Sequence, residues 1–107
     1  MGKRYMTLTF LCFTHRKWLL QQPDQAIESY TNACKKGMYL VDQAQWKHAI
    51  PYLGCAFESA EILLTTRALP PSMALQWYVQ SLVKLINALN HLGFRSGCID
   101  VYVSAIA

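Results

Sequence analysis

The chain has 107 residues, of which 53% are hydrophobic and 15% charged, and its formal net charge is +4. This composition excludes a disordered region, which would be poorer in apolar residues, and a low-complexity segment, which would be richer in Pro and Gly. The length suits one domain, which on folding removes roughly 65% of the chain's surface from water. The charge is concentrated at one end, because residues 1–17 hold four basic residues and no acid, whereas residues 18–107 hold six of each.

Residues 1–20 are predicted to form a basic N-terminal arm. Residues 5–13 begin with alternation and continue as an apolar run, and since a lone strand would have no partner, we expect irregular or helical structure. Such an arm can bind nucleic acid weakly or lie on an anionic membrane surface. A solubilising flank, or an arm packed on a partner subunit, is the more ordinary interpretation. The candidate contact residues are Lys3, Arg4, Arg16 and Lys17.

Two helices are predicted next. Pro23 and Asp24 are typical of a helix start, and apolar residues recur at helical spacing for about 20 residues, with a break near 42–45. A second apolar stripe runs to residues 65–67. This helix begins either at Trp46, with a kink at Pro51, or near residue 49, with the proline in its first turn. Its acids Glu58 and Glu61, three residues apart, are expected on a solvated face.

The third predicted helix has the most regular stripe in the chain. Ser72 is expected to cap its start, and Gly93 to end it as the residue after the C-cap. A fourth helix is expected from about Ser96. Four amphipathic segments joined by short breaks predict an all-α antiparallel array over residues 21–107. The third helix is expected to bury Leu75, Tyr78, Val79, Leu82, Leu85, Ile86, Leu89 and Leu92.

Small and aromatic residues recur in these helices in a pattern that resembles the tetratricopeptide (TPR) repeat, a pair of antiparallel helices. Gly37-Met-Tyr-Leu40 resembles the Gly-x-x-Tyr element of the family's first helix, and Trp46-Lys-His-Ala49-Ile50 resembles the aromatic-x-x-Ala that opens the second. The resemblance covers residues 30–107. Ala49 and Cys98 take equivalent positions in the two helix pairs and lie 49 residues apart. A regular array repeats about every 34 residues, so this array is a degenerate one. An unrelated four-helix bundle is the alternative. The remaining matches are Leu53, Ala56, Leu89, Cys98, Ile99, Tyr102 and Ala105.

The resemblance implies a protein-interaction module. TPR-like arrays hold a peptide or helix in a groove lined by the first helix of each pair. Lys84, Asn87 and His91 follow helical spacing, so they give the third helix a donor-rich face that suits carbonyls or a carboxylate, although a merely solvated face is the ordinary interpretation. Carried over to this chain, the groove is lined by Thr31, Cys34, Lys35, Met38, Asp42, Gln80, Lys84, Asn87 and His91, with Trp77 as a further apolar contact.

We expect no enzymatic activity, no cofactor and no metal site. The sequence contains none of the HExxH, GxSxG, Walker A and GxGxxG patterns. His48 and Cys55 lie seven residues apart, but no third group marks a catalytic arrangement. Cys12 and His15 supply at most half of a metal site.

The four cysteines predict a reducing compartment. Cys12, Cys34, Cys55 and Cys98 lack metal or redox spacing and sit among apolar residues, which favours free thiols in a cytoplasmic protein. We expect no signal peptide, because basic residues follow the first apolar run without a cleavage site. No stretch reaches the ~18 unbroken apolar residues of a spanning helix.

The apolar end of the chain predicts self-association. A helical array needs polar terminal faces, whereas residues 104–107 continue an apolar stripe. A second copy or a longer array would cover that end, and we favour a homodimer. The sequence therefore predicts a non-enzymatic adaptor or chaperone-like binder of a peptide or helical segment. The alternative is a nucleic-acid-associated regulatory protein that uses the basic arm.

Overall fold

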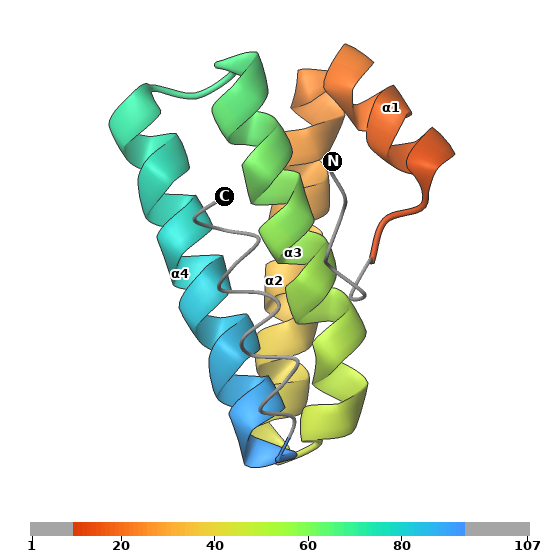
Figure 1. Ribbon diagram of the computed structural model, residues 1–107, viewed down its shortest axis with the longest axis vertical. Helices are drawn as coiled ribbons and strands as arrows, with labels where there is room; N and C mark the ends of the chain where they lie inside the picture. The colour runs from red at the N-terminus through yellow and green to blue at the C-terminus, as the bar shows by residue number, and fades with distance from the viewer. Residues whose placement is uncertain (1–9, 94–107) are drawn as a thin grey trace, which may run out of the picture.

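The computed structural model describes residues 10–93, apart from the side chain of Phe13. These residues form four helices and no strand: α1 (Phe13–Gln21), α2 (Pro23–Asp42), α3 (Trp46–Thr66) and α4 (Pro71–His91) (Figure 1). The three long helices alternate in direction, and both α2 and α4 pack on α3. The predicted all-α array of about four helices is confirmed. The helix expected from Ser96 lies outside the described residues, and α1, within the expected arm, is one of the four.

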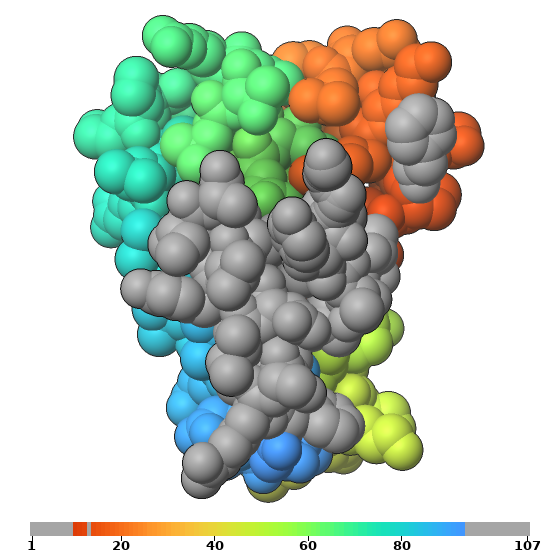
Figure 2. All heavy atoms as spheres, viewed as in Figure 1, coloured from red at the N-terminus to blue at the C-terminus, as the bar shows by residue number. Residues whose placement is uncertain are grey.

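Helix α1 lies at one end of the long helices. It contacts both α2 and α3, and its atoms sit beside the last turns of α3 in Figure 2. The side chain of Cys12 caps it, because its Sγ accepts a hydrogen bond from the backbone N–H of His15 (3.4 Å). None of the helices in residues 10–93 has the length and apolar character required to cross a membrane.

The turn between α2 and α3 follows from backbone hydrogen bonding. Ala44 adopts a left-handed conformation (φ 58°), which lets its N–H reach the carbonyl of Val41 (2.8 Å) and that of Gln45 reach Leu40 (2.8 Å). These two bonds satisfy the last carbonyls of α2 and reverse the chain. The predicted helix from Pro23 and the break near residues 42–45 are confirmed.

Helix α3 begins at Trp46, so the first of the two predicted starts is correct, and Pro51 lies inside the helix. Its end at residues 65–67 is also confirmed, with Arg67 in the left-handed conformation (φ 60°). Ten residues of α3 are buried, because helices cover it on more than one side. This central position explains why its sequence is so apolar.

The C-terminal end of α4 is as predicted, whereas its N-terminal end is not. Gly93 follows the helix with φ 78° and donates to the carbonyl of Asn90 (3.0 Å), as predicted for a glycine after the C-cap. The predicted cap by Ser72 is wrong. The helix starts at Pro71, after Pro70, and no side chain caps it. Pro71 instead starts the helix, because its ring fixes a helical φ and its missing N–H removes one of the donors that lack a partner in the first turn.

The buried face of α4 also differs from the prediction. The exposed fractions of Leu75 and Val79 are 53% and 47%, so the expectation that both are buried is wrong. Small residues form much of the actual buried face, because they let α4 approach α3 closely. That face comprises Ala74, Ser81, Leu85, Ala88 and Leu89.

Close approach also explains two glycines. A Cβ on Gly37 of α2 would lie 2.7 Å from Cδ2 of Leu53, so this glycine brings α2 against α3. A Cβ on Gly54 would collide with the ring of Phe10, so this glycine makes room for the segment that leads into α1. The core has two parts, one around α1, α2 and α3 and one between α3 and α4.

Candidate functional site

A groove runs between α2 and α4, which are parallel to each other and both pack on α3. Its volume is about 420 Å³, which is in the range of a site for a small ligand or a few peptide side chains. We call it the α2–α4 groove. It is lined by Tyr30, Thr31, Cys34, Lys35 and Met38 from α2 and by Trp77, Gln80 and Lys84 from α4.

Two stacked aromatic rings join the helices at this groove. The rings of Tyr30 and Trp77 lie 4.5 Å apart between centroids and are nearly parallel, at 9°. The Tyr30 hydroxyl donates a hydrogen bond to the backbone carbonyl of Trp77 (3.3 Å). Burial raises the pKa of Tyr30 well above its usual range, so the phenol keeps its proton and remains a donor. The stack therefore gives the groove a fixed aromatic wall.

The charge of the groove comes from two lysines. Lys35 is exposed on α2, and Lys84 is half-buried on α4 with its Nζ 3.6 Å from Sγ of Cys34. None of the lining residues that the structure describes is acidic. A thiol is a weak acceptor, so the Lys84 ammonium keeps donors for a stronger one. Lys35 and Lys84 therefore favour a ligand with negative charge or carbonyl oxygens.

The structure brings together four of the six residues that the sequence proposed for the groove, namely Lys35, Met38, Gln80 and Lys84. Asn87 and His91 lie further along α4 and do not line it. The ring of His91 instead stacks on Trp46 at 3.8 Å between centroids. Of the other proposed residues, Thr31, Cys34 and Trp77 line the groove and Asp42 does not.

Sequence reasoning missed Tyr30 as a groove residue. Its apolar spacing in α2 indicates burial, which is correct, since its exposed fraction is 6%. Its contact with Trp77 spans 47 residues, and no local pattern encodes this pairing. Only the relative placement of α2 and α4 reveals it.

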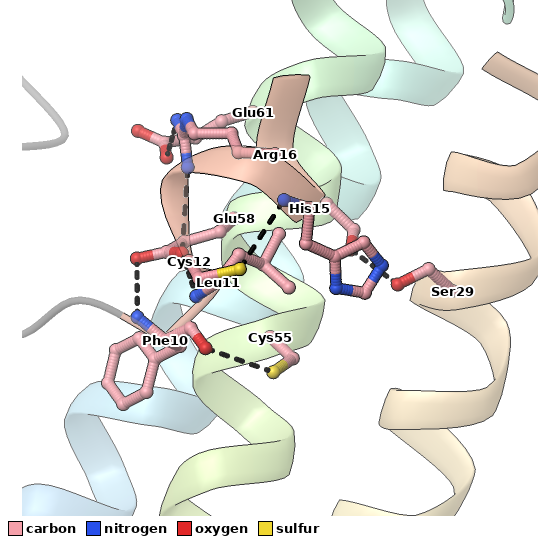
Figure 3. A network of polar contacts seen from close by, with 10 residues as sticks. Phe10, Leu11, Cys12, His15, Arg16, Ser29, Cys55, Glu58 and Glu61 are labelled. Atoms are coloured by element: carbon pink, nitrogen blue, oxygen red, sulfur yellow. Dashed lines mark hydrogen bonds and ion pairs between the residues drawn. The ribbon is translucent and has the colours of Figure 1, made fainter. Parts of the chain in front are cut away.

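A second polar arrangement lies where the N-terminal segment meets α3 (Figure 3). The buried carboxylate of Glu58 accepts hydrogen bonds from the backbone N–H groups of Phe10 (3.1 Å) and Leu11 (2.7 Å). Arg16 bridges the two acids of α3, with Nη1 3.5 Å from Glu58 Oε1 and Nη2 3.0 Å from Glu61 Oε1. The expectation that Glu58 lies on a solvated face is wrong, because residues 10–16 cover it.

Burial raises the pKa of the Glu58 carboxyl. The N–H groups of Leu11 and Phe10 and the Arg16 guanidinium act in the opposite direction, but the loss of solvent is the larger effect. The arrangement makes Glu58 a positioning residue for the N-terminal segment.

Of the four basic residues proposed for nucleic-acid or membrane contact, the structure describes Arg16 and Lys17. Lys3 and Arg4 lie outside the described residues. Arg16 is paired with Glu58 and Glu61, and Lys17 is exposed.

The cysteines considered for catalysis or metal binding make hydrogen bonds to the backbone. His48 is exposed, and Cys55 is half-buried with its Sγ 3.9 Å from the carbonyl of Phe10, to which it donates. Burial raises the pKa of the Cys55 thiol, which disfavours the nucleophilic thiolate. Cys12 and His15 make the helix cap described above. Among residues 10–93, no group of three or more His, Cys, Asp and Glu side chains could hold a metal ion.

Comparisons with known proteins add no assignment. No protein-family model, curated protein or solved structure matches the chain. The function of the α2–α4 groove therefore has to be inferred from its own residues.

Proposed function

We propose that the chain is a non-enzymatic protein-interaction module that binds a peptide or a helical segment in the α2–α4 groove. The observation that carries this proposal is a fixed aromatic wall, Tyr30 and Trp77, beside two lysines, with no acid among the described residues of the lining. Apolar surface beside a few polar groups is the usual composition of a recognition site. The resemblance to TPR repeats points to the same use, and the TPR-like interpretation stays part of the proposal.

The groove suits a ligand segment that is both apolar and acidic. An apolar ligand side chain would lie against Met38 and the ring of Trp77. A ligand carboxylate would lie near Lys35 and Lys84, and the Gln80 amide would bond to backbone groups. The described residues offer nothing that favours the nucleic-acid alternative, because Arg16 is already paired with two acids.

The experiment is a selection of short random peptides on the immobilised chain. We expect the selected peptides to combine acidic with large apolar residues. Their affinity should fall about three- to tenfold for the double variant Lys35→Gln/Lys84→Gln, since each exposed or half-exposed pair contributes up to about 1 kcal/mol.

The matched control is Lys36→Gln/Lys47→Gln, which removes the same charge from α2 and α3 outside the groove. It should bind the selected peptides as the native chain does. Equal losses in both double variants would indicate general charge attraction and would contradict the groove. Failure to select any peptide would contradict peptide binding itself.

We further propose that the chain forms a homodimer and acts in the cytoplasm. An exposed apolar flank on α4 supports self-association, with exposed fractions of 53% at Leu75, 47% at Val79 and 59% at Val83. Cys12, Cys34 and Cys55 are free thiols, which fits a reducing compartment.

A further inference from the structure

A second cavity lies where α1, α2 and α3 meet, separate from the α2–α4 groove. Its volume is about 500 Å³, within the range of small-molecule sites. We call it the α1–α2–α3 cavity. Among the described residues, none lines both this cavity and the groove. It is lined by Phe10, Leu11, His15, Ser29, Asn32, Ala33, Lys36, Tyr52 and Cys55.

The lining of the cavity combines apolar and polar groups. Phe10, Leu11 and Ala33 provide carbon surface, and Tyr52 adds an aromatic ring. The polar groups are the hydroxyls of Ser29 and Tyr52, an amide, an imidazole, a thiol and the Lys36 ammonium, and none of the described lining residues carries a carboxylate. The ammonium lies 5.8 Å from the centroid of the Tyr52 ring, so a cation stands beside an aromatic surface.

The walls of the cavity are held in place before a ligand binds. The two hydrogen bonds to the Glu58 carboxylate fix the backbone of Phe10 and Leu11, and the thiol of Cys55 donates to the Phe10 carbonyl. Figure 3 shows this segment crossing α3 while His15 of α1 and Ser29 of α2 stand on facing elements. The Ser29 hydroxyl is itself held by the hydroxyl of Ser59 (3.0 Å). A preformed wall reduces the entropy cost of binding.

We propose that the α1–α2–α3 cavity binds a small aromatic carboxylate. The aromatic body would lie on Phe10, Leu11 and Tyr52, and the carboxylate would lie at Lys36, with the Asn32 amide as a further donor. The Lys36 cation, which has no acid beside it among the described lining residues, favours a negative head group, and an apolar surface of this size favours a ring system. This site does not depend on the peptide function proposed for the groove.

The probes are 2-naphthoate and its neutral amide, 2-naphthamide, which have the same ring system and differ in charge. Binding to the full chain is followed by ¹H–¹⁵N NMR titration. We expect 2-naphthoate to bind more tightly than 2-naphthamide and to shift the amide signals of Asn32, Lys36, Tyr52 and Cys55. Shifts confined to the α2–α4 groove, equal affinity for the two probes, or no binding of either probe would overturn the proposal.

Two neighbouring lysines supply the variant and its control. Lys36 lines this cavity and Lys35 lines the α2–α4 groove, and both are exposed, so neither substitution should prevent folding. Lys36→Gln should weaken 2-naphthoate binding about threefold, as expected for an exposed ion pair, and leave 2-naphthamide binding unchanged. Lys35→Gln should change neither. A loss of 2-naphthoate affinity in Lys35→Gln and not in Lys36→Gln would overturn the assignment of the carboxylate to Lys36. An unchanged 2-naphthoate affinity in Lys36→Gln would also overturn it.

Discussion

At the scale of single residues, Glu58 is the side chain with the most consequence for the N-terminal segment. Its exposed fraction is 4%, and its carboxylate is the acceptor for two backbone N–H groups that lie 47 and 48 residues earlier. Backbone N–H groups that are buried without an acceptor are costly. Glu58 therefore helps to hold residues 10–16 on α3.

We expect Glu58→Ala to lower the free energy of unfolding by about 2 kcal/mol, because it leaves the N–H groups of Phe10 and Leu11 without their acceptor. Urea unfolding followed by circular dichroism measures the change. The control is Glu61→Ala, which removes the more exposed partner of Arg16 and should cost less than about 1 kcal/mol. Equal costs for the two variants would contradict the role given to Glu58.

The stability cost of Glu58→Ala is expected to depend on pH. Burial raises the pKa of Glu58 above its usual 4.5, so the folded chain holds this proton more tightly than the unfolded chain does. Its contribution to stability is therefore present at acid pH and declines as pH rises from about 4.5 through the raised pKa. The cost of Glu58→Ala should shrink over that window. The charged groups that face the carboxyl are Arg16 and Glu61, so Glu61→Ala should be measured over the same range.

The sequence predicts part of the candidate sites and not the rest. The resemblance to TPR repeats predicts Lys35, Met38, Gln80 and Lys84 in one groove, and the structure brings them together. Glu58 could not be placed in this way. Its partners are backbone groups of a distant segment, which carry no side-chain signal, and a pair of acids on a helix ordinarily indicates solvent.

At the scale of elements, the turn after α2 contains a conformation that its residue does not favour. Ala44 has φ 58° at the position after the C-cap, where glycine is the usual residue because its lack of a Cβ removes a steric penalty. The corresponding position after α4 is occupied by Gly93. Replacing Ala44 by glycine is therefore expected to stabilise the α2–α3 turn.

We expect Ala44→Gly to raise the free energy of unfolding by about 1 kcal/mol, since the relief of left-handed strain exceeds the added entropy of the unfolded chain. Thermal unfolding measures the shift. The control is Ala68→Gly in the α3–α4 connection, where the backbone is not left-handed, so glycine should be neutral or slightly destabilising. A destabilised Ala44→Gly variant would contradict the turn conformation.

The bounds of elements were more predictable than their buried faces. Pro23, the break near residues 42–45 and Gly93 are local signals, and each appears where expected. The buried face of α4 depends on how closely it approaches α3, and small residues decide that distance. The stripe of large apolar residues therefore predicts burial for Leu75 and Val79, although both are exposed.

At the scale of the whole molecule, one side of α4 is among the apolar surfaces that the described fold leaves uncovered. Leu75, Val79 and Val83 are spaced four residues apart, so they lie along one line of the helix, on the side away from Trp77 and Lys84. The only residue of α4 with a formal charge is Lys84, which lines the groove. Two copies can therefore bring these lines together without opposing like charges.

An antiparallel pair of α4 helices would place Val79 beside its own copy and Leu75 opposite Val83, as a two-fold interface requires. We expect light scattering coupled to gel filtration to show a dimer of the native chain. Val79→Glu/Val83→Glu should be monomeric at the same concentration, because it would place four carboxylates in an apolar interface.

The control Gln80→Glu adds a charge to the groove side of α4 and should remain dimeric. A monomeric native chain, or a dimer that survives the double substitution, would contradict this interface. A dimer lost equally in Gln80→Glu would move the contact to the groove and remove the space proposed for a peptide.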